Sequence, residues 1–64
     1  MIIATIKNWT VVKAQGSLFL KGYAYGHVNS DYAKDGDLIL TSQIWGSSGS
    51  HHVMCADGLY KLEG

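Results

Sequence analysis

Residues 42–52, with the sequence SQIWGSSGSHH, hold the side chains of this chain that are best able to do chemistry. The stretch joins a tryptophan, a run of glycine and serine and a histidine pair, and Cys55 follows shortly after. Three uses fit these residue types: a metal site, a cradle for a phosphate group, or a flexible loop that only joins two strands.

A metal site in this region would draw its ligands from His51, His52 and Cys55, with His27 as a fourth candidate. Neighbouring residues of a strand point to opposite faces, so the two adjacent histidines do not easily reach one ion. The chain also has no paired C-x-x-C and no H-x₃-H spacing. We therefore predict no cofactor, but the sequence leaves open whether these three residues bind a metal.

A phosphate cradle would use the backbone N–H groups of residues 46–50, GSSGS, which have no side chain large enough to pack. An aromatic plane before this loop and an imidazole after it would complete a site for a small phosphorylated ligand, such as a nucleotide, held between two or more subunits. The candidate residues are Trp45, Ser47, Ser48, Ser50 and His51. The alternative is a mobile hairpin tip without a ligand.

Catalysis is not expected from the remaining polar residues. No serine, histidine or aspartate stands where the sequence would place a nucleophile beside an oriented base. The stretch Asp35-Gly36-Asp37 has two carboxylates but lacks the further ligands of a calcium loop, and a turn before a strand explains it. We predict that the protein is not an enzyme.

The chain length predicts a single domain over residues 1–64. A chain this short buries only about 60% of its unfolded surface, so its core needs a supplement. Cys55 is the only cysteine, which excludes a disulfide within the chain and fits a reducing cytoplasm. Self-association, giving a homo-oligomer, is the supplement we expect first.

Charge and hydropathy exclude two classes of partner. Five basic and five acidic residues cancel, so the chain shows no excess of positive charge for a nucleic-acid backbone. The apolar start MIIATIK has no basic segment before it, and no stretch approaches the roughly 20 apolar residues that cross a bilayer. We expect neither nucleic acid nor a membrane as partner.

Short apolar runs separated by glycines, with no proline, are typical of strands and turns. No window has apolar residues at helical spacing, so we predict an all-β fold with little or no helix. The expected architecture is a small antiparallel barrel or strongly twisted sheet of five or six strands, about the size of an SH3 domain. The six expected strands lie near residues 2–7, 9–14, 17–25, 37–45, 51–56 and 59–63, with residues 26–36 as an irregular link.

Two hairpins are predicted from a weak internal repeat. Residues 10–22 align with residues 52–64 without a gap, and in both copies a glycine able to adopt positive φ ends a tight turn. Duplication and independent hairpin chemistry both explain this match. In the strand over residues 17–25, small residues at 22, 24 and 26 share a face, which predicts a bend or the close approach of another backbone.

Aromatic residues are the other candidates for a binding surface. The strand over residues 37–45 has bulky apolar side chains on both faces, which exceeds what one small sheet can bury. Aromatic side chains on a small β scaffold without net charge are typical anchors of protein interfaces. The residues expected to form the contact are Tyr23, Tyr25, Tyr32 and Trp45, with His27 at its edge.

The order of motifs along the chain resembles a group of short phage and prophage proteins. The residues that carry the resemblance are GSLFLKG (16–22), Gly26-His27, Tyr32, Asp35-Gly36, ILTSQI (39–44) and DGLYKLEG (57–64). The link VNSDYAK and the insertion WGSSGSHH depart from that pattern. The resemblance implies a setting rather than a reaction: a non-enzymatic accessory protein that binds and inhibits a host protein, for example one of host defence. The alternative is an oligomeric protein that sequesters a nucleotide-like ligand.

Overall fold

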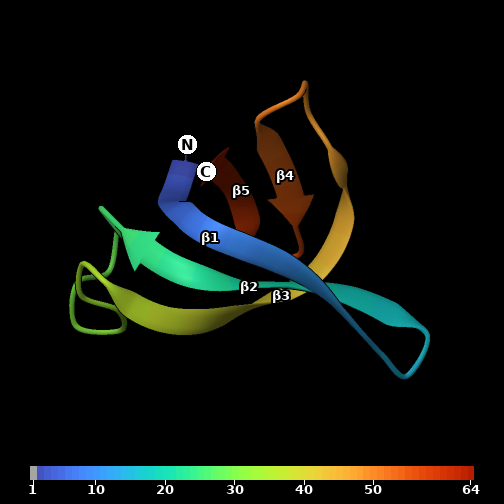
Figure 1. The fold of residues 1–64 in the computed structure, drawn as a ribbon, viewed down its shortest axis with the longest axis horizontal. Helices are drawn as coiled ribbons and strands as arrows, with labels where there is room; N and C mark the ends of the chain where they lie inside the picture. Colours follow the sequence, from blue (N-terminus) through green and yellow to red (C-terminus); the bar gives the residue numbers. More distant parts are fainter. Residues whose placement is uncertain (1) are drawn as a thin grey trace.

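The computed structural model describes residues 2–64 and shows a small closed β-barrel (Figure 1). Successive strands are neighbours around the barrel, and the last strand closes it against the first. The strands are β1 (Ile2–Ala14), β2 (Ser17–Tyr25), β3 (Asp37–Ser47), β4 (His52–Cys55) and β5 (Gly58–Glu63). The predicted fold class, a small all-β barrel with little or no helix, is confirmed over these residues. Within the same range, no helix offers the length and apolar character of a membrane span.

The first strand differs from the expectation, because β1 runs through residues 2–14 where two strands were expected. Asn8 has a φ of 50°, and the register between β1 and β2 shifts between Lys7 and Thr10. A bulge of this kind bends a strand without ending it. The bend lets the second half of β1 follow β2 away from the barrel, and Figure 1 shows this hairpin projecting beyond the other strands.

The strand that closes the barrel pairs in a direction that was not expected. The four pairs between consecutive strands are antiparallel, whereas β1 and β5 are parallel, with Ile6 opposite Leu62. A purely antiparallel barrel needs an even number of strands, so five strands in up-and-down order must close with one parallel pair. The odd strand number therefore dictates the parallel seam.

Both predicted hairpins are present, but their turns are not equivalent. In the first, Ala14 lies opposite Ser17, and Gln15 and Gly16 between them have φ values of 52° and 78°. Positive φ at both positions matches the twist of the flanking strands. In the second, Cys55 lies opposite Gly58. The repeat aligns Ala14 with Ala56, so the second turn comes one residue earlier than the repeat would place it.

The core is thin. Among residues 2–64, seven hydrophobic residues are buried, and three of them are alanines: Ala4, Ile6, Leu20, Ala24, Ala33, Cys55 and Tyr60. Thr41 is buried with them, and its hydroxyl oxygen accepts a hydrogen bond of 3.1 Å from the backbone N–H of Leu20. Half-buried aliphatic side chains pack against this core and complete it: Ile3, Ile39, Ile44, Val53 and Leu62.

Gly22 is the point where β2 and the bulge of β1 come closest. A Cβ at this position would collide with the side chain of the fully buried Ile6 and would lie 3.0 Å from the carbonyl oxygen of Lys7 and 3.1 Å from the Cα of Trp9. The close approach of another backbone, predicted from the small residues of this strand, is thus present at Gly22.

One surface of the sheet is apolar and open, and we call it the β2–β3 outer face. It consists of Phe19, Lys21, Tyr23, Leu38 and Leu40. In the register of the two strands, Tyr23 lies opposite Leu38 and Lys21 opposite Leu40. Tyr23 is 41% exposed, and Leu38 and Leu40 are each 53% exposed.

A bulge in β3 changes which side chains face inward. Ile39 and Thr41 alternate with the exposed Leu38 and Leu40, as a regular strand requires. The register with β2 then shifts between Leu40 and Gln43, and Ile44 packs against the core opposite Cys55. Because of this bulge, residues on both sides of it face the core: Ile39 and Thr41 before it and Ile44 after it.

The link over residues 26–36 holds no helix and is fixed by its own hydrogen bonds. Gly26 N–H donates to the Asp35 carboxylate at 2.7 Å, and Val28 N–H donates to the carbonyl of Ile3 at 2.8 Å. Ala33 is buried in the core and anchors the middle of the link. The link is therefore placed against the barrel wall and can contribute side chains to a site.

Candidate functional site

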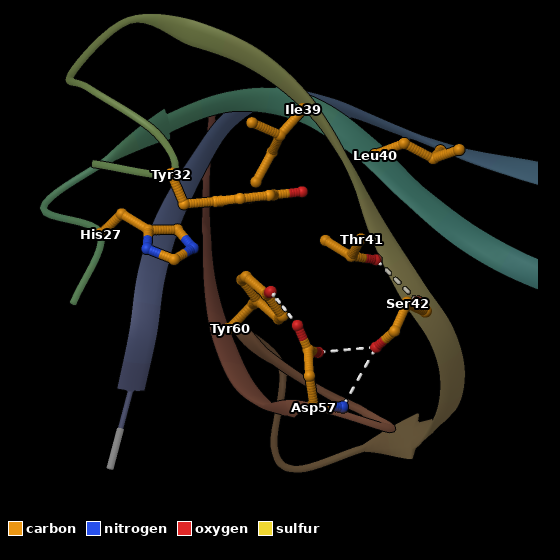
Figure 2. A pocket seen from close by; sticks show the side chains of 8 residues that line it. All are labelled: His27, Tyr32, Ile39, Leu40, Thr41, Ser42, Asp57 and Tyr60. Carbon is orange, nitrogen blue, oxygen red and sulfur yellow. Dashed lines mark hydrogen bonds between the residues drawn. The ribbon is translucent and has the colours of Figure 1, made fainter. Parts of the chain in front are cut away.

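A cavity of about 450 Å³ opens on the surface where the link, β3 and the β4–β5 turn meet. Figure 2 shows the eight residues that line it: His27, Tyr32, Ile39, Leu40, Thr41, Ser42, Asp57 and Tyr60. The link supplies two aromatic rings, β3 supplies aliphatic and hydroxyl side chains, and the turn supplies a carboxylate. Ile39 points into the cavity, whereas the side chain of Leu40 extends away from it (Figure 2).

The Asp57 carboxylate is held by two hydroxyl groups. Ser42 Oγ donates to Asp57 Oδ1 at 2.6 Å, and the Tyr60 hydroxyl donates to Asp57 Oδ2 at 2.8 Å. Ser42 Oγ also accepts from the backbone N–H of Asp57 at 3.1 Å. Each carboxylate oxygen keeps acceptor capacity, since an ionised carboxylate offers about four lone-pair directions. The carboxylate is thus oriented but not saturated.

Tyr60 supports this carboxylate from inside the core. The residue is 2% exposed, and its hydroxyl reaches the wall of the cavity. Burial raises the pKa of Tyr60 above its ordinary value, and the hydrogen bond to Asp57 and the charge of Asp57 raise it further. The phenol therefore stays protonated and remains a donor to Asp57 through the physiological pH range.

His27 and Tyr32 form the side of the cavity opposite Asp57 (Figure 2). Their ring centroids lie 5.3 Å apart at an interplanar angle of 42°. The backbone N–H of Asn29 donates to His27 Nδ1 at 2.9 Å, so the neutral imidazole carries its proton on Nε2. The Asn29 side chain accepts from the backbone N–H of Tyr32 at 3.3 Å. Hydrogen bonds of Asn29 within the link thus position both rings.

Of the residues predicted as binding groups, the structure brings His27 and Tyr32 together in this cavity. Tyr23 lies on the β2–β3 outer face. Tyr25 is half-buried, with the ammonium of Lys7 4.6 Å from the centre of its ring. The predicted aromatic contact is therefore divided over at least two surfaces.

The other predicted binding residues, Trp45, Ser47, Ser48 and His51, do not line the cavity. Trp45 is 68% exposed near the end of β3, and the turn that follows lies away from the link in Figure 1. The backbone N–H of Ser48 donates to the carbonyl of His52 at 3.0 Å, so it is not free for an anion. Ser50 belongs to the same exposed turn. Binding of a phosphorylated ligand by this turn stays a prediction.

Residues 2–64 contain no group of three His, Cys, Asp or Glu side chains that could hold a metal ion. Cys55 points into the core, where its Sγ lies 3.5 Å from Thr41 Oγ1, and burial raises the pKa of its thiol. His51 is exposed in the turn before β4, and His52 begins that strand. The three candidate ligands thus do not gather around one point.

The sequence analysis missed Ser42, Asp57 and Tyr60 as parts of one site. The signal was the hairpin register: extending the pair Ile44–Cys55 by two residues places Ser42 opposite Asp57. That register depends on the bulges of β3, and no glycine or proline marks the first of them, between Leu40 and Gln43. The sequence alone therefore does not fix the register that brings these residues together.

Comparison of the chain with protein-family models, with curated proteins and with solved structures found no match.

Proposed function

We propose that this protein is a non-catalytic accessory protein of the phage type, which binds a host protein and blocks it through the β2–β3 outer face. The observation that carries the proposal is the exposure of Tyr23, Leu38 and Leu40 on neighbouring strands, at 41%, 53% and 53%. Directly opposite residues of paired strands have Cβ atoms about 4.5–5.5 Å apart, so these side chains form one continuous patch.

The positions of these side chains favour a contact surface over incidental exposure. Leu38 and Leu40 alternate with the inward-facing Ile39 and Thr41, and a polar residue at either outward position would preserve the strand. A contiguous apolar patch on a small soluble protein often marks an interaction site. The aromatic and aliphatic side chains of this face are of the kinds found in the buried centres of protein interfaces.

The charge of the face favours a different protein over a second copy of this chain. Lys21 stands beside Leu40, and among residues 2–64 no carboxylate lies within 4.0 Å of its ammonium. A two-fold dimer places the same patch on both subunits, so two lysine-bearing faces without an acidic residue would meet. A partner that presents apolar side chains and a carboxylate complements the face instead.

The size of the chain fits a protein partner as well. A stable interface covers about 800 Å² on each side. The accessible surface of the chain is 4104 Å², so such a contact would take about a fifth of it.

The test is recovery of partners from host lysate with matched variants. The double variant Leu38→Ser/Leu40→Ser removes apolar groups from the face, and the control Val11→Ser/Met54→Ser removes comparable exposed groups elsewhere. We expect wild type and control to recover the same protein and the face variant to lose it, with all three folded by circular dichroism. Equal recovery by both variants, or native mass spectra showing only further copies of the chain, would contradict the proposal.

A further inference from the structure

We infer that the cavity between the link and the β4–β5 turn recognises a cationic group, a guanidinium or an alkylammonium, which Asp57 binds against the ring of Tyr32. This site shares Leu40 with the β2–β3 outer face but is otherwise made of other residues: the Leu40 side chain points away from the cavity, and the polar groups of the cavity come from β3, the turn and β5 (Figure 2). The inference stands whether or not the outer face binds a protein.

The charge of the cavity points to a cation. Asp57 accepts only neutral hydroxyl donors, and among residues 2–64 no lysine or histidine nitrogen lies within 4.0 Å of its carboxylate. A carboxylate that is oriented by hydrogen bonds but lacks a counter-ion attracts a positively charged donor, and such charge-assisted bonds are stronger than neutral ones. A guanidinium can use both carboxylate oxygens at once.

The wall opposite Asp57 suits the rest of such a group. Tyr32 is 64% exposed, and its ring lies across the cavity from Asp57 and Tyr60 (Figure 2). A cation within about 6 Å of an aromatic ring centre is attracted by the negative face of the ring. Ile39 gives the alkyl chain that carries the charge an apolar surface to pack against.

The same residues argue against other ligand classes. An anion such as phosphate would meet the Asp57 carboxylate at the polar end of the cavity. A metal ion would find the Asp57 carboxylate and, on the opposite side of the cavity, only His27, since no group of three ligating side chains exists in residues 2–64. A purely apolar ligand would leave the free acceptor sites of Asp57 buried beneath it.

The site is built before any ligand arrives. Tyr60 is almost fully buried and fixes one carboxylate oxygen, Ser42 fixes the other, and Asn29 fixes His27 and the backbone of Tyr32. A volume of about 450 Å³ lies within the usual range for small-ligand sites. The cationic group has two sources: an arginine or lysine side chain of a partner protein, or a free small molecule.

The experiment is an NMR titration of the full chain with N-acetylarginine amide, followed by backbone amide shifts. The control ligand is N-acetylcitrulline amide, which has nearly the same shape without the charge. We expect saturable shifts at Ser42, Asp57 and Tyr60, with a Kd on the order of 1 mM for a ligand of this size. The citrulline compound should bind at least about tenfold more weakly.

Three variants locate the binding. Asp57→Asn should weaken binding at least about tenfold, and Tyr32→Leu, at an exposed position, about two- to fivefold. Trp9→Leu, at an exposed aromatic residue outside the cavity, should leave the Kd unchanged. Asp57→Asn also disturbs two hydrogen bonds, so its melting temperature is compared with that of wild type, and the Tyr32 variant tests the site independently.

Two further ligands distinguish the sources. Tighter binding of N-acetyl-Leu-Arg-Leu amide than of the single residue would assign the cation to a partner protein, whereas tighter binding of n-propylguanidinium would assign it to a small molecule. Either result supports a cation site. Equal binding of the arginine and citrulline compounds would overturn the inference. So would a Kd that is weakened by Trp9→Leu and not by Tyr32→Leu.

Discussion

Replacing Gly22 by alanine tests the packing of β2 against the bulge of β1. The new Cβ would collide with the side chain of Ile6, which is fully buried, and would lie 3.0 Å and 3.1 Å from backbone atoms of Lys7 and Trp9. None of these groups is a flexible chain end, so the strands must separate. Overpacking of this kind costs about 1–3 kcal/mol. A domain of this length has only about 3–10 kcal/mol of stability, so the loss is a large fraction.

The matched control is Gly46→Ala in β3. A Cβ added at Gly46 would have no atom within 4 Å, and this glycine does not have positive φ, so alanine should be neutral or stabilise by up to about 1 kcal/mol. Thermal unfolding followed by circular dichroism should show Gly22→Ala melting about 5–20 °C below wild type and Gly46→Ala at or slightly above it. Equal melting temperatures for the two variants would refute the proposed contact.

Three further outcomes are expected. Thr41→Val should lower the free energy of unfolding by about 1–3 kcal/mol in urea, because the buried N–H of Leu20 loses its acceptor, whereas Thr41→Ser should retain most of it; equal losses would contradict this. Because the pKa of Tyr60 is raised in the folded state, the unfolded chain loses the phenol proton first as the pH rises. The free energy of unfolding should therefore keep the full contribution of Tyr60 below about pH 10 and decrease above it by up to about 1.4 kcal/mol per pH unit. In Tyr60→Phe, the free energy of unfolding measured in urea should decrease less steeply at alkaline pH than in wild type. Parallel pH profiles for the two proteins would contradict this prediction. A chelator should leave the melting temperature unchanged, and a decrease would reveal a metal site involving His51, His52 or Cys55.

The fold class could be predicted from the sequence because its signals are local. Glycines between apolar runs mark the turns, and Gln15-Gly16 adopts the positive φ values that a two-residue hairpin needs. Alternation along β2 also predicts that Leu20 and Ala24 share a face, and both are buried in the core. These features depend on a few neighbouring residues, so they can be predicted without knowledge of the tertiary contacts.

The features that were missed depend on bulges. The bulge at Asn8 has positive φ but no glycine to mark it. The sequence pattern therefore predicts two strands, whereas β1 is continuous. The shifts of register in β3 decide that Ile44 faces the core and that Ser42 meets Asp57. A bulge is stabilised by contacts between distant segments, and a single sequence records those contacts only indirectly. The cavity was therefore hidden although two of its residues, His27 and Tyr32, were predicted as binding groups.

The most direct test of the β2–β3 outer face as a contact surface is site-specific photo-crosslinking in host cells. A benzophenone amino acid replaces Leu40 on this face in one variant and Met54 on β4 in the other; both side chains are exposed in the free protein. We predict one heterologous crosslinked product at position 40 that is absent at position 54. Crosslinking at both positions with equal yield, or a product at position 40 that contains only this chain, would contradict the account.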